Sequence, residues 1–382
     1  MKFRFRLVAI VICAFAGTSG VMRAQASSTD DFDVLASRAS AALRSDPGQA
    51  VPLYRQALAL KPDWAEGWFD LGGGLYQIDQ FSEAEQAFRK AAALAPGNGA
   101  VWGFLGLCES RLGKYREALT DIHKGEVAGL PDNLPFVSAV HNEAALIYLR
   151  SHDYSGSIEE LRVLAKAGDN SSPTVRALGV TALGMPYMPN ELPGNKLPLV
   201  DLAGRAALAF YAGNGDEGAP LFKQLIAQYP NEPGVHYFVG ISLLERDPNA
   251  SLAEFRKELA ISPSHVQARQ QIAMIEIKTG DAASAAVITR EALQLQPLNA
   301  LSHAILGRAY EHMGRHEDAT SEFETAVKLA PDNPELHFSL GQNYRRVGRI
   351  VDADKQIAEF KRLKSIQDSR GVSAQDGPGE NR

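Results

Sequence analysis

The chain has 382 residues, of which 45% are hydrophobic and 22% are charged, an ordinary mixture for a protein that buries a core. Its formal net charge at pH 7 is −6, from 39 lysines and arginines against 45 aspartates and glutamates. This acidic balance argues against nucleic acid as a partner and against electrostatic docking on anionic lipid, because both need a basic surface.

The N-terminal residues have the pattern of a secretory signal peptide. Three basic residues precede an apolar run at 7–17, and Ala24 and Ala26 place small residues at the −3 and −1 positions of a cleavage site. The alternative is a membrane anchor, but the apolar run, even extended to Met22, is shorter than the roughly 20 residues that span a bilayer. We therefore expect residues 1–26 to be removed by cleavage near Ala26. The mature protein is then secreted or periplasmic, with no stable membrane insertion.

Cleavage would leave one of the two cysteines, Cys108, so that no internal disulfide could form. Cys108 lies between Leu107 and Leu112 in a stretch that we expect to be helical. We interpret it as a small buried hydrophobic residue, and the alternative is a reactive thiol.

Prolines recur with a period close to 34 residues. Pro62 and Pro96 are 34 residues apart, and a second series follows at spacings of 33, 34 and 34 residues: Pro230, Pro263, Pro297 and Pro331. Because proline cannot continue a helix, each of them marks the end of a helical stretch. The sequence therefore predicts an internal repeat.

Residues 300–331 show the repeat most clearly. Its first predicted helix has an apolar stripe at spacings of three and four residues: Leu306, Tyr310 and Met313. Gly314 follows, where a left-handed C-cap favours glycine. Gly307 is small enough to let the second helix approach and to leave room for Phe323. A hairpin this short cannot bury its own apolar face, so neighbouring hairpins must stack.

This pattern resembles the signature of the tetratricopeptide-repeat (TPR) family, with His303 where the family often has tryptophan. Residues 65–96 and the residues from 99 onward repeat it, with Trp68 and Trp102 at that position. The resemblance implies an all-α fold, a right-handed superhelical solenoid of stacked helix-turn-helix hairpins. It is specific for the fold and unspecific for function, since the same scaffold carries many unrelated functions.

The domain order follows from these repeats. We expect the signal peptide at 1–26, an N-terminal array of about four repeats at 31–171, a helix and a proline-rich insertion at 172–198, a C-terminal array of about five repeats at 199–364 and a disordered tail at 365–382. The insertion is too rich in proline for a regular hairpin: Pro186, Pro189, Pro193 and Pro198. The tail is polar and rich in glycine, serine, aspartate and glutamine.

Nine histidines raise a metal hypothesis. Four of them share the fourth position of their repeats: His141, His236, His303 and His337. A shared repeat position indicates a shared packing role, whereas a metal needs several ligands in one shell. His312 and His316 are four residues apart, but Gly314 lies at the predicted turn between them. Because no nucleophile elbow or phosphate-binding loop is present either, we predict no enzyme, catalytic residue, cofactor or metal.

In the TPR family the first helices line a concave surface, and ligands commonly touch five positions of each. Carried over to this chain, the resemblance implies a partner-binding groove of fourteen residues: Phe69, Tyr76, Leu107, Asn142, Leu149, Phe210, Tyr211, Tyr237, Ile241, Met274, Ile277, Arg308, Phe338 and Arg345. The alternative is that these side chains pack against neighbouring helices or against the loop at 185–198.

These observations favour a non-enzymatic protein–protein interaction scaffold or assembly adaptor of the cell envelope. Its partner would be a protein or peptide, bound in the groove as an extended or amphipathic helical segment. A homo-oligomer could form through the C-terminal end, where no further repeat follows Phe360 and Leu363. The alternative is an extracytoplasmic hydrolase or metal-binding protein that uses residues 172–198 as a lid.

Overall fold

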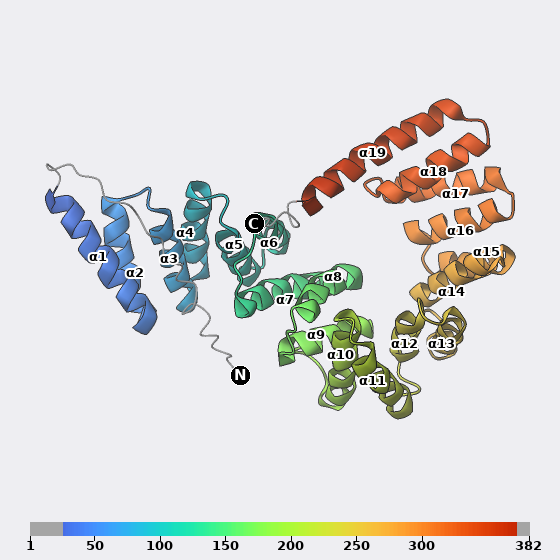
Figure 1. Cartoon of the computed structure of the whole chain (residues 1–382), viewed down its shortest axis with the longest axis horizontal. Helices are drawn as coiled ribbons and strands as arrows, with labels where there is room; N and C mark the ends of the chain where they lie inside the picture. The colour runs from blue at the N-terminus through green and yellow to red at the C-terminus, as the bar shows by residue number, and fades with distance from the viewer. Residues whose placement is uncertain (1–25, 373–382) are drawn as a thin grey trace, which may run out of the picture. The chain divides into compact units, whose positions relative to one another are not determined.

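The computed structural model describes residues 26–372, which form nineteen α-helices and no strand. The predicted all-α class of stacked helical hairpins is confirmed (Figure 1). The predicted signal peptide, apart from Ala26, and the last ten residues of the predicted tail lie outside the described residues. Within the described part of the chain, no helix combines the length and apolar character that a membrane span requires.

The chain divides into two compact units. Unit 1 comprises residues 26–177 and 188–190, and unit 2 comprises residues 178–187 and 191–372. The boundary crosses helix α9 (Ser172–Ala182), which is followed by an irregular loop and a short 3₁₀ helix, η2 (Gly194–Lys196).

Unit 1 contains four hairpins, in each of which a helix packs against the next one along the chain. The pairs are α1 (Ala26–Ser45) with α2 (Pro47–Leu60), α3 (Ala65–Gln77) with α4 (Phe81–Leu94), α5 (Gly99–Arg111) with α6 (Tyr115–Ala128), and α7 (Leu134–Arg150) with α8 (Tyr154–Lys166). The core includes Cys108, which is fully buried as predicted. Burial raises the pKa of its thiol, so the residue behaves as a small hydrophobic side chain.

Unit 2 contains five hairpins. They are α10 (Leu197–Tyr211) with α11 (Gly215–Gln228), α12 (Val235–Leu243) with α13 (Pro248–Ile261), α14 (Val266–Thr279) with α15 (Ala282–Leu295), α16 (Ala300–His312) with α17 (His316–Leu329), and α18 (Pro334–Arg346) with α19 (Ile350–Val372).

The last helix corrects one predicted boundary. Helix α19 continues to Val372, so residues 365–372 of the predicted disordered tail are helical. Polar composition alone does not end a helix, and the sequence has no proline after Ile350 until Pro378.

A glycine-against-phenylalanine contact recurs inside the hairpins. In α16 a Cβ added at Gly307 would lie 2.9 Å from the ring of Phe323 on α17, and the phenylalanine is 1% exposed. The same contact occurs between Gly72 and Phe88 and between Gly240 and Phe255. Gly314 ends α16 with a φ of +73°, which confirms the predicted left-handed cap. A small residue on the first helix thus admits a large side chain from the second.

We expect Phe323→Ala to lower the free energy of unfolding of unit 2 by about 3–5 kcal/mol, because the substitution leaves a cavity between two packed helices. The three tryptophans, Trp64, Trp68 and Trp102, all lie in unit 1. Urea denaturation followed by hydrogen exchange of α16–α17 peptides measures unit 2, and tryptophan fluorescence monitors unit 1 as an internal control.

The matched control is Leu298→Ala, at a side chain that is 80% exposed, with an expected change within about 0.5 kcal/mol. If Phe323→Ala lowers the free energy of unfolding of unit 2 no more than the control does, the role of this packing contact is contradicted.

Candidate functional site

First helices of neighbouring hairpins contact one another in both units. In unit 1, α1 contacts α3, α3 contacts α5, and α5 contacts α7, and in unit 2, α14 contacts α16. The predicted groove residues lie on these first helices. Each of them can meet a partner only if its side chain is accessible and is not covered by a neighbouring helix.

Three of the fourteen predicted residues are buried. Leu107, Leu149 and Ile277 are 5%, 4% and 8% exposed. Leu107 and Ile277 belong to hydrophobic clusters formed with neighbouring helices. The prediction that these three side chains face a partner is therefore wrong. They are buried by neighbouring side chains, as the alternative prediction had it.

Aromatic residues predicted for the groove in unit 1 also pack within the unit. The ring of Phe69 lies 5.7 Å from Phe88 and 5.6 Å from Phe104, measured between centroids. Tyr76 contacts Phe81 and Phe104 edge-on, at 5.3 and 6.1 Å. Asn142 Nδ2 donates a hydrogen bond of 2.8 Å to Thr174 Oγ1. Phe69 and Tyr76 thus contact rings of their own hairpin and Phe104 of the next one, and Asn142 bonds to α9. These half-buried side chains leave only part of their surface accessible.

The half-buried aromatic residues of unit 2 behave in the same way. Phe210 lies 5.0 Å from Tyr211 and contacts Phe222 and Phe238 edge-on. Tyr237 lies 5.6 Å from Phe255, and burial raises its pKa to about 12. Ile241 and Met274 are partly buried against the neighbouring hydrophobic clusters. These side chains of the predicted groove are thus largely engaged in contacts within their own hairpin or with the next one.

The exposed members of the predicted set lie on α16 and α18. Arg308 and Arg345 are exposed, and Phe338 is 39% exposed, with its ring 5.1 Å from that of Phe360. Arg345 Nη2 lies 3.3 Å from Asp354 Oδ1, whereas no ion pair joins Arg308 to another of the described residues. These three side chains are the exposed members of the predicted groove, and the other eleven are half-buried or buried.

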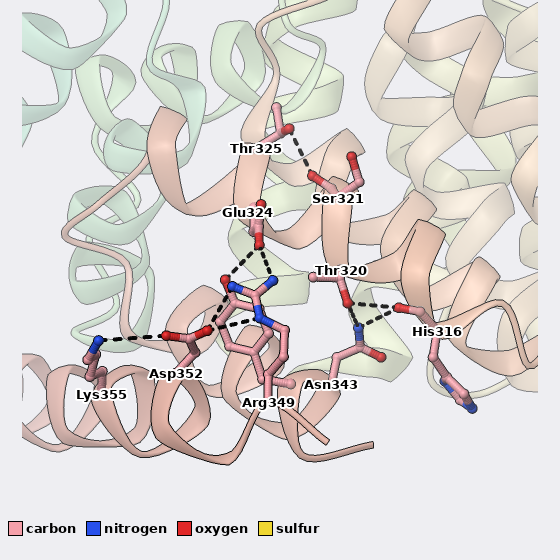
Figure 2. A network of polar contacts seen from close by, with 10 residues as sticks. His316, Thr320, Ser321, Glu324, Thr325, Asn343, Arg349, Asp352 and Lys355 are labelled. Carbon is pink, nitrogen blue, oxygen red and sulfur yellow. Dashed lines mark hydrogen bonds and ion pairs between the residues drawn. The ribbon is translucent and has the colours of Figure 1, made fainter. Parts of the chain in front are cut away.

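Polar contacts fix the last two hairpins against each other (Figure 2). The guanidinium of Arg349 lies between Glu324 of α17 and Asp352 of α19, with its Nη1 2.9 Å from Glu324 Oε1. Asn343 of α18 donates from Nδ2 to Thr320 Oγ1 at 2.7 Å and to the backbone oxygen of His316 at 2.8 Å. Helix α18, which carries Phe338 and Arg345, is therefore held against α17 by these hydrogen bonds.

The repeat-position histidines take the place of tryptophan in a specific hydrogen bond. Trp68 and Trp102 each donate from Nε1 to the carbonyl oxygen of the proline six residues earlier, at 2.8 Å. His236, His303 and His337 make the equivalent bond from Nε2, at 2.8–3.0 Å. The second nitrogen, Nδ1, faces a side-chain oxygen of the hairpin's second helix in each case: Glu254, Glu322 and Gln356. These contacts support the predicted packing role.

A fixed spacing in the sequence marks the pairs that the repeat-position histidines form with oxygens of the second helix. Each repeat-position histidine is followed 18 or 19 residues later by Glu or Gln, as His303 is by Glu322. Position 87, 19 residues after Trp68, holds alanine. His312 ends α16 and His316 begins α17, which confirms that a turn separates them.

Comparisons with known proteins agree with the repeat assignment. Family models described as tetratricopeptide repeat match residues 65–98 and 276–342. The human Protein O-mannosyl-transferase TMTC3 is 25% identical over 266 residues, which are 65% of this chain and 28% of that protein. The chain therefore spans little more than a quarter of this relative's length.

Solved structures of MamA are also similar. MamA 41-end from Desulfovibrio magneticus RS-1 shares 23% identity, with a TM-score of 0.41 over 46% of this chain and 98% of that chain. A crystal structure titled MamA shares 18% identity, with a TM-score of 0.39 over 43% of this chain and 96% of that chain.

The His236–Glu254 pair predicts a pH dependence of stability. Burial alone would raise the pKa of Glu254, but hydrogen bonds from Lys257 and His236 outweigh it and hold the pKa below its ordinary value. A folded-state pKa that is depressed gives stability that is present above the unfolded-state value of about 4.3 and is lost as the pH falls below it. Glu254→Gln should therefore destabilise unit 2 at pH 6 and cost less at pH 3.

Urea denaturation followed by far-UV circular dichroism at both pH values measures this difference. Glu245→Gln, at an exposed glutamate, is the control and should leave the pH profile of the parent chain. If Glu254→Gln lowers the free energy of unfolding equally at pH 6 and pH 3, the charge of the carboxylate contributes nothing to stability.

Proposed function

The chain is a tetratricopeptide-repeat protein, and from this premise we propose that it is a non-enzymatic scaffold that binds a segment of a partner protein on the exposed face of α16 and α18. The observation that carries the proposal is the group of Arg308, Phe338 and Arg345, which are accessible on first helices while most of the predicted groove is covered. An exposed apolar side chain and cations on these two helices suit a segment with one large apolar side chain and nearby carboxylates.

The surroundings of Arg308 support an acidic partner segment. The other cations of these hairpins are largely neutralised within unit 2, since Arg346 pairs with Glu311 and Arg349 pairs with Glu324 and Asp352. Arg308 has no such ion pair within the described part of the chain. A carboxylate of the partner would supply the missing counter-charge and would favour binding at low salt.

The proposed location is the cell envelope or the outside of the cell. Its support is the signal-like pattern at residues 1–26, with basic residues, an apolar run and small residues before the expected cleavage point. The transferase activity in the name of the human relative is that protein's own and is not proposed for this chain.

Crosslinking followed by affinity purification tests the binding face. The full chain and the double variant Arg308→Glu, Phe338→Ser are used as bait in extracts of the source cells, and recovered proteins are quantified by mass spectrometry. We expect the double variant to recover at least about tenfold less partner than the parent chain, because it removes both the anchor and the cation.

The matched control is Lys361→Glu with Val351→Ser, which makes the same kinds of change at exposed residues of α19. It should recover the partner as the parent chain does. Equal recovery by both double variants would exclude this face, and a product made only of copies of this chain would favour self-association over segment binding.

A further inference from the structure

Four titratable side chains of unit 1 converge between its last two hairpins. His123 and Glu126 come from α6, His141 from α7 and Glu160 from α8. His123 Nε2 lies 3.4 Å from Glu160 Oε1, and His141 Nδ1 lies 2.8 Å from Glu160 Oε2. His141 Nδ1 is also 3.3 Å from Glu126 Oε1. Residues 37 positions apart in the sequence thus share one small volume.

This cluster departs from the packing role of the other repeat-position histidines. His236, His303 and His337 bond through Nε2 to a proline carbonyl six residues earlier. His141 does not, because α7 begins at Leu134 and the residue six positions earlier, Pro135, lies within that helix. His141 instead lies in a cluster with a second histidine, His123, and a second carboxylate, Glu126.

One oxygen of the cluster lacks a hydrogen-bond donor. Glu126 Oε1 is out of contact with solvent and accepts no hydrogen bond, although it is near His141. A buried carboxylate oxygen without a donor is costly, and a cation is one way to satisfy it. A carboxylate oxygen of Glu126 also lies within 4.8 Å of a ligand atom of His123 and of Glu160.

We propose that His123, Glu126 and Glu160 bind a divalent transition-metal ion, and that His141 is a positioning residue that orients Glu160. One ligand atom from each of the three lies within 4.8 Å of the others. Metal–ligand bonds of about 2.0–2.2 Å at tetrahedral angles separate ligand atoms by about 3.3–3.6 Å. The 3.4 Å between His123 Nε2 and Glu160 Oε1 already matches this separation, and a small side-chain closure completes the shell.

The ligand types indicate which ion fits. Imidazole with carboxylates suits Zn²⁺ and related transition metals, whereas Ca²⁺ and Mg²⁺ take oxygen ligands. Three protein ligands leave a coordination position for water. The side chain of His123 is 44% exposed and that of Glu160 is 9% exposed, so the ion can enter from solvent and bind at the buried carboxylate.

A bound ion would link two hairpins. His123 and Glu126 belong to the α5–α6 hairpin, and Glu160 belongs to the α7–α8 hairpin. Binding to the folded state alone raises stability by mass action, so the ion should stabilise the stacking of these hairpins. The site lies in unit 1 and is independent of the binding face proposed for unit 2.

Calorimetric titration tests the site. The full chain is stripped with EDTA, desalted and titrated with zinc sulfate, in parallel with His123→Ala, Glu126→Gln and the control His312→Ala, at an exposed histidine outside the cluster. We expect one Zn²⁺ per chain, an affinity at least about tenfold weaker in the first two variants, and no change in the control. Zn²⁺ should raise the Tm of the parent chain and not that of Glu126→Gln.

The positioning role of His141 has its own readout. In the Co²⁺-loaded chain, His141→Gln should shift the visible d–d absorption while the far-UV circular dichroism stays that of the parent. An unchanged spectrum would overturn the positioning role.

Two results would overturn the metal site. The first is no Zn²⁺ binding by the folded parent chain. The second is binding of equal affinity in the parent, His123→Ala and Glu126→Gln. Should His123→Ala fail to fold by circular dichroism, Glu126→Gln decides alone, since it preserves the shape of the side chain.

Discussion

A helical hairpin of about 34 residues has apolar surface on the sides that face its neighbours, and it becomes stable only when a neighbouring hairpin covers that surface. The structure meets this constraint with contacts between successive helices throughout each unit. Within a hairpin, Gly307 lets Phe323 of the second helix enter, and between hairpins α17 bonds to α18 and α19 through Asn343 and Arg349. The binding face that we propose consists of side chains that remain exposed after this stacking has buried or half-buried the other predicted groove residues.

A hydrogen bond to the turn between hairpins is the second interaction that recurs along the chain. A ring nitrogen at the fourth repeat position holds the carbonyl of the preceding proline, whether the residue is Trp68 or His303. Where histidine replaces tryptophan, its other nitrogen is paired with an oxygen of the second helix. His141 makes no hydrogen bond to a proline carbonyl among the described residues, but its Nδ1 contacts Glu160. This difference distinguishes the cluster around Glu160 from the other repeat-position histidines.

Much of the fold could be predicted because its causes are local. The prolines end helices, and Leu306 and Tyr310 are buried, as the sequence predicts, and Gly314 has the predicted left-handed conformation. Met313, the third residue of the predicted apolar stripe, is 40% exposed, because it lies at the C-cap of α16. The end of α19 was predicted too early, because polar composition alone does not end a helix and no proline occurs between Ile350 and Pro378. The prediction that Leu107 and Ile277 are accessible in the groove was wrong. The position of a residue in the repeat does not specify the size of the neighbouring side chains that cover it. The approach of His123 to Glu160 joins different hairpins, so no periodic signal reveals it.

If each hairpin depends on the neighbour that covers it, hydrogen exchange on a chain that ends at Leu329 tests that dependence most directly. Removing α18 and α19 should make the amides of α16 and α17 exchange much faster, because their shared apolar face becomes exposed. Unit 1, which is a separate compact body, should keep its protection. Unchanged protection in α16 and α17 would contradict the dependence, since those helices would then be stable without the neighbour that covers them.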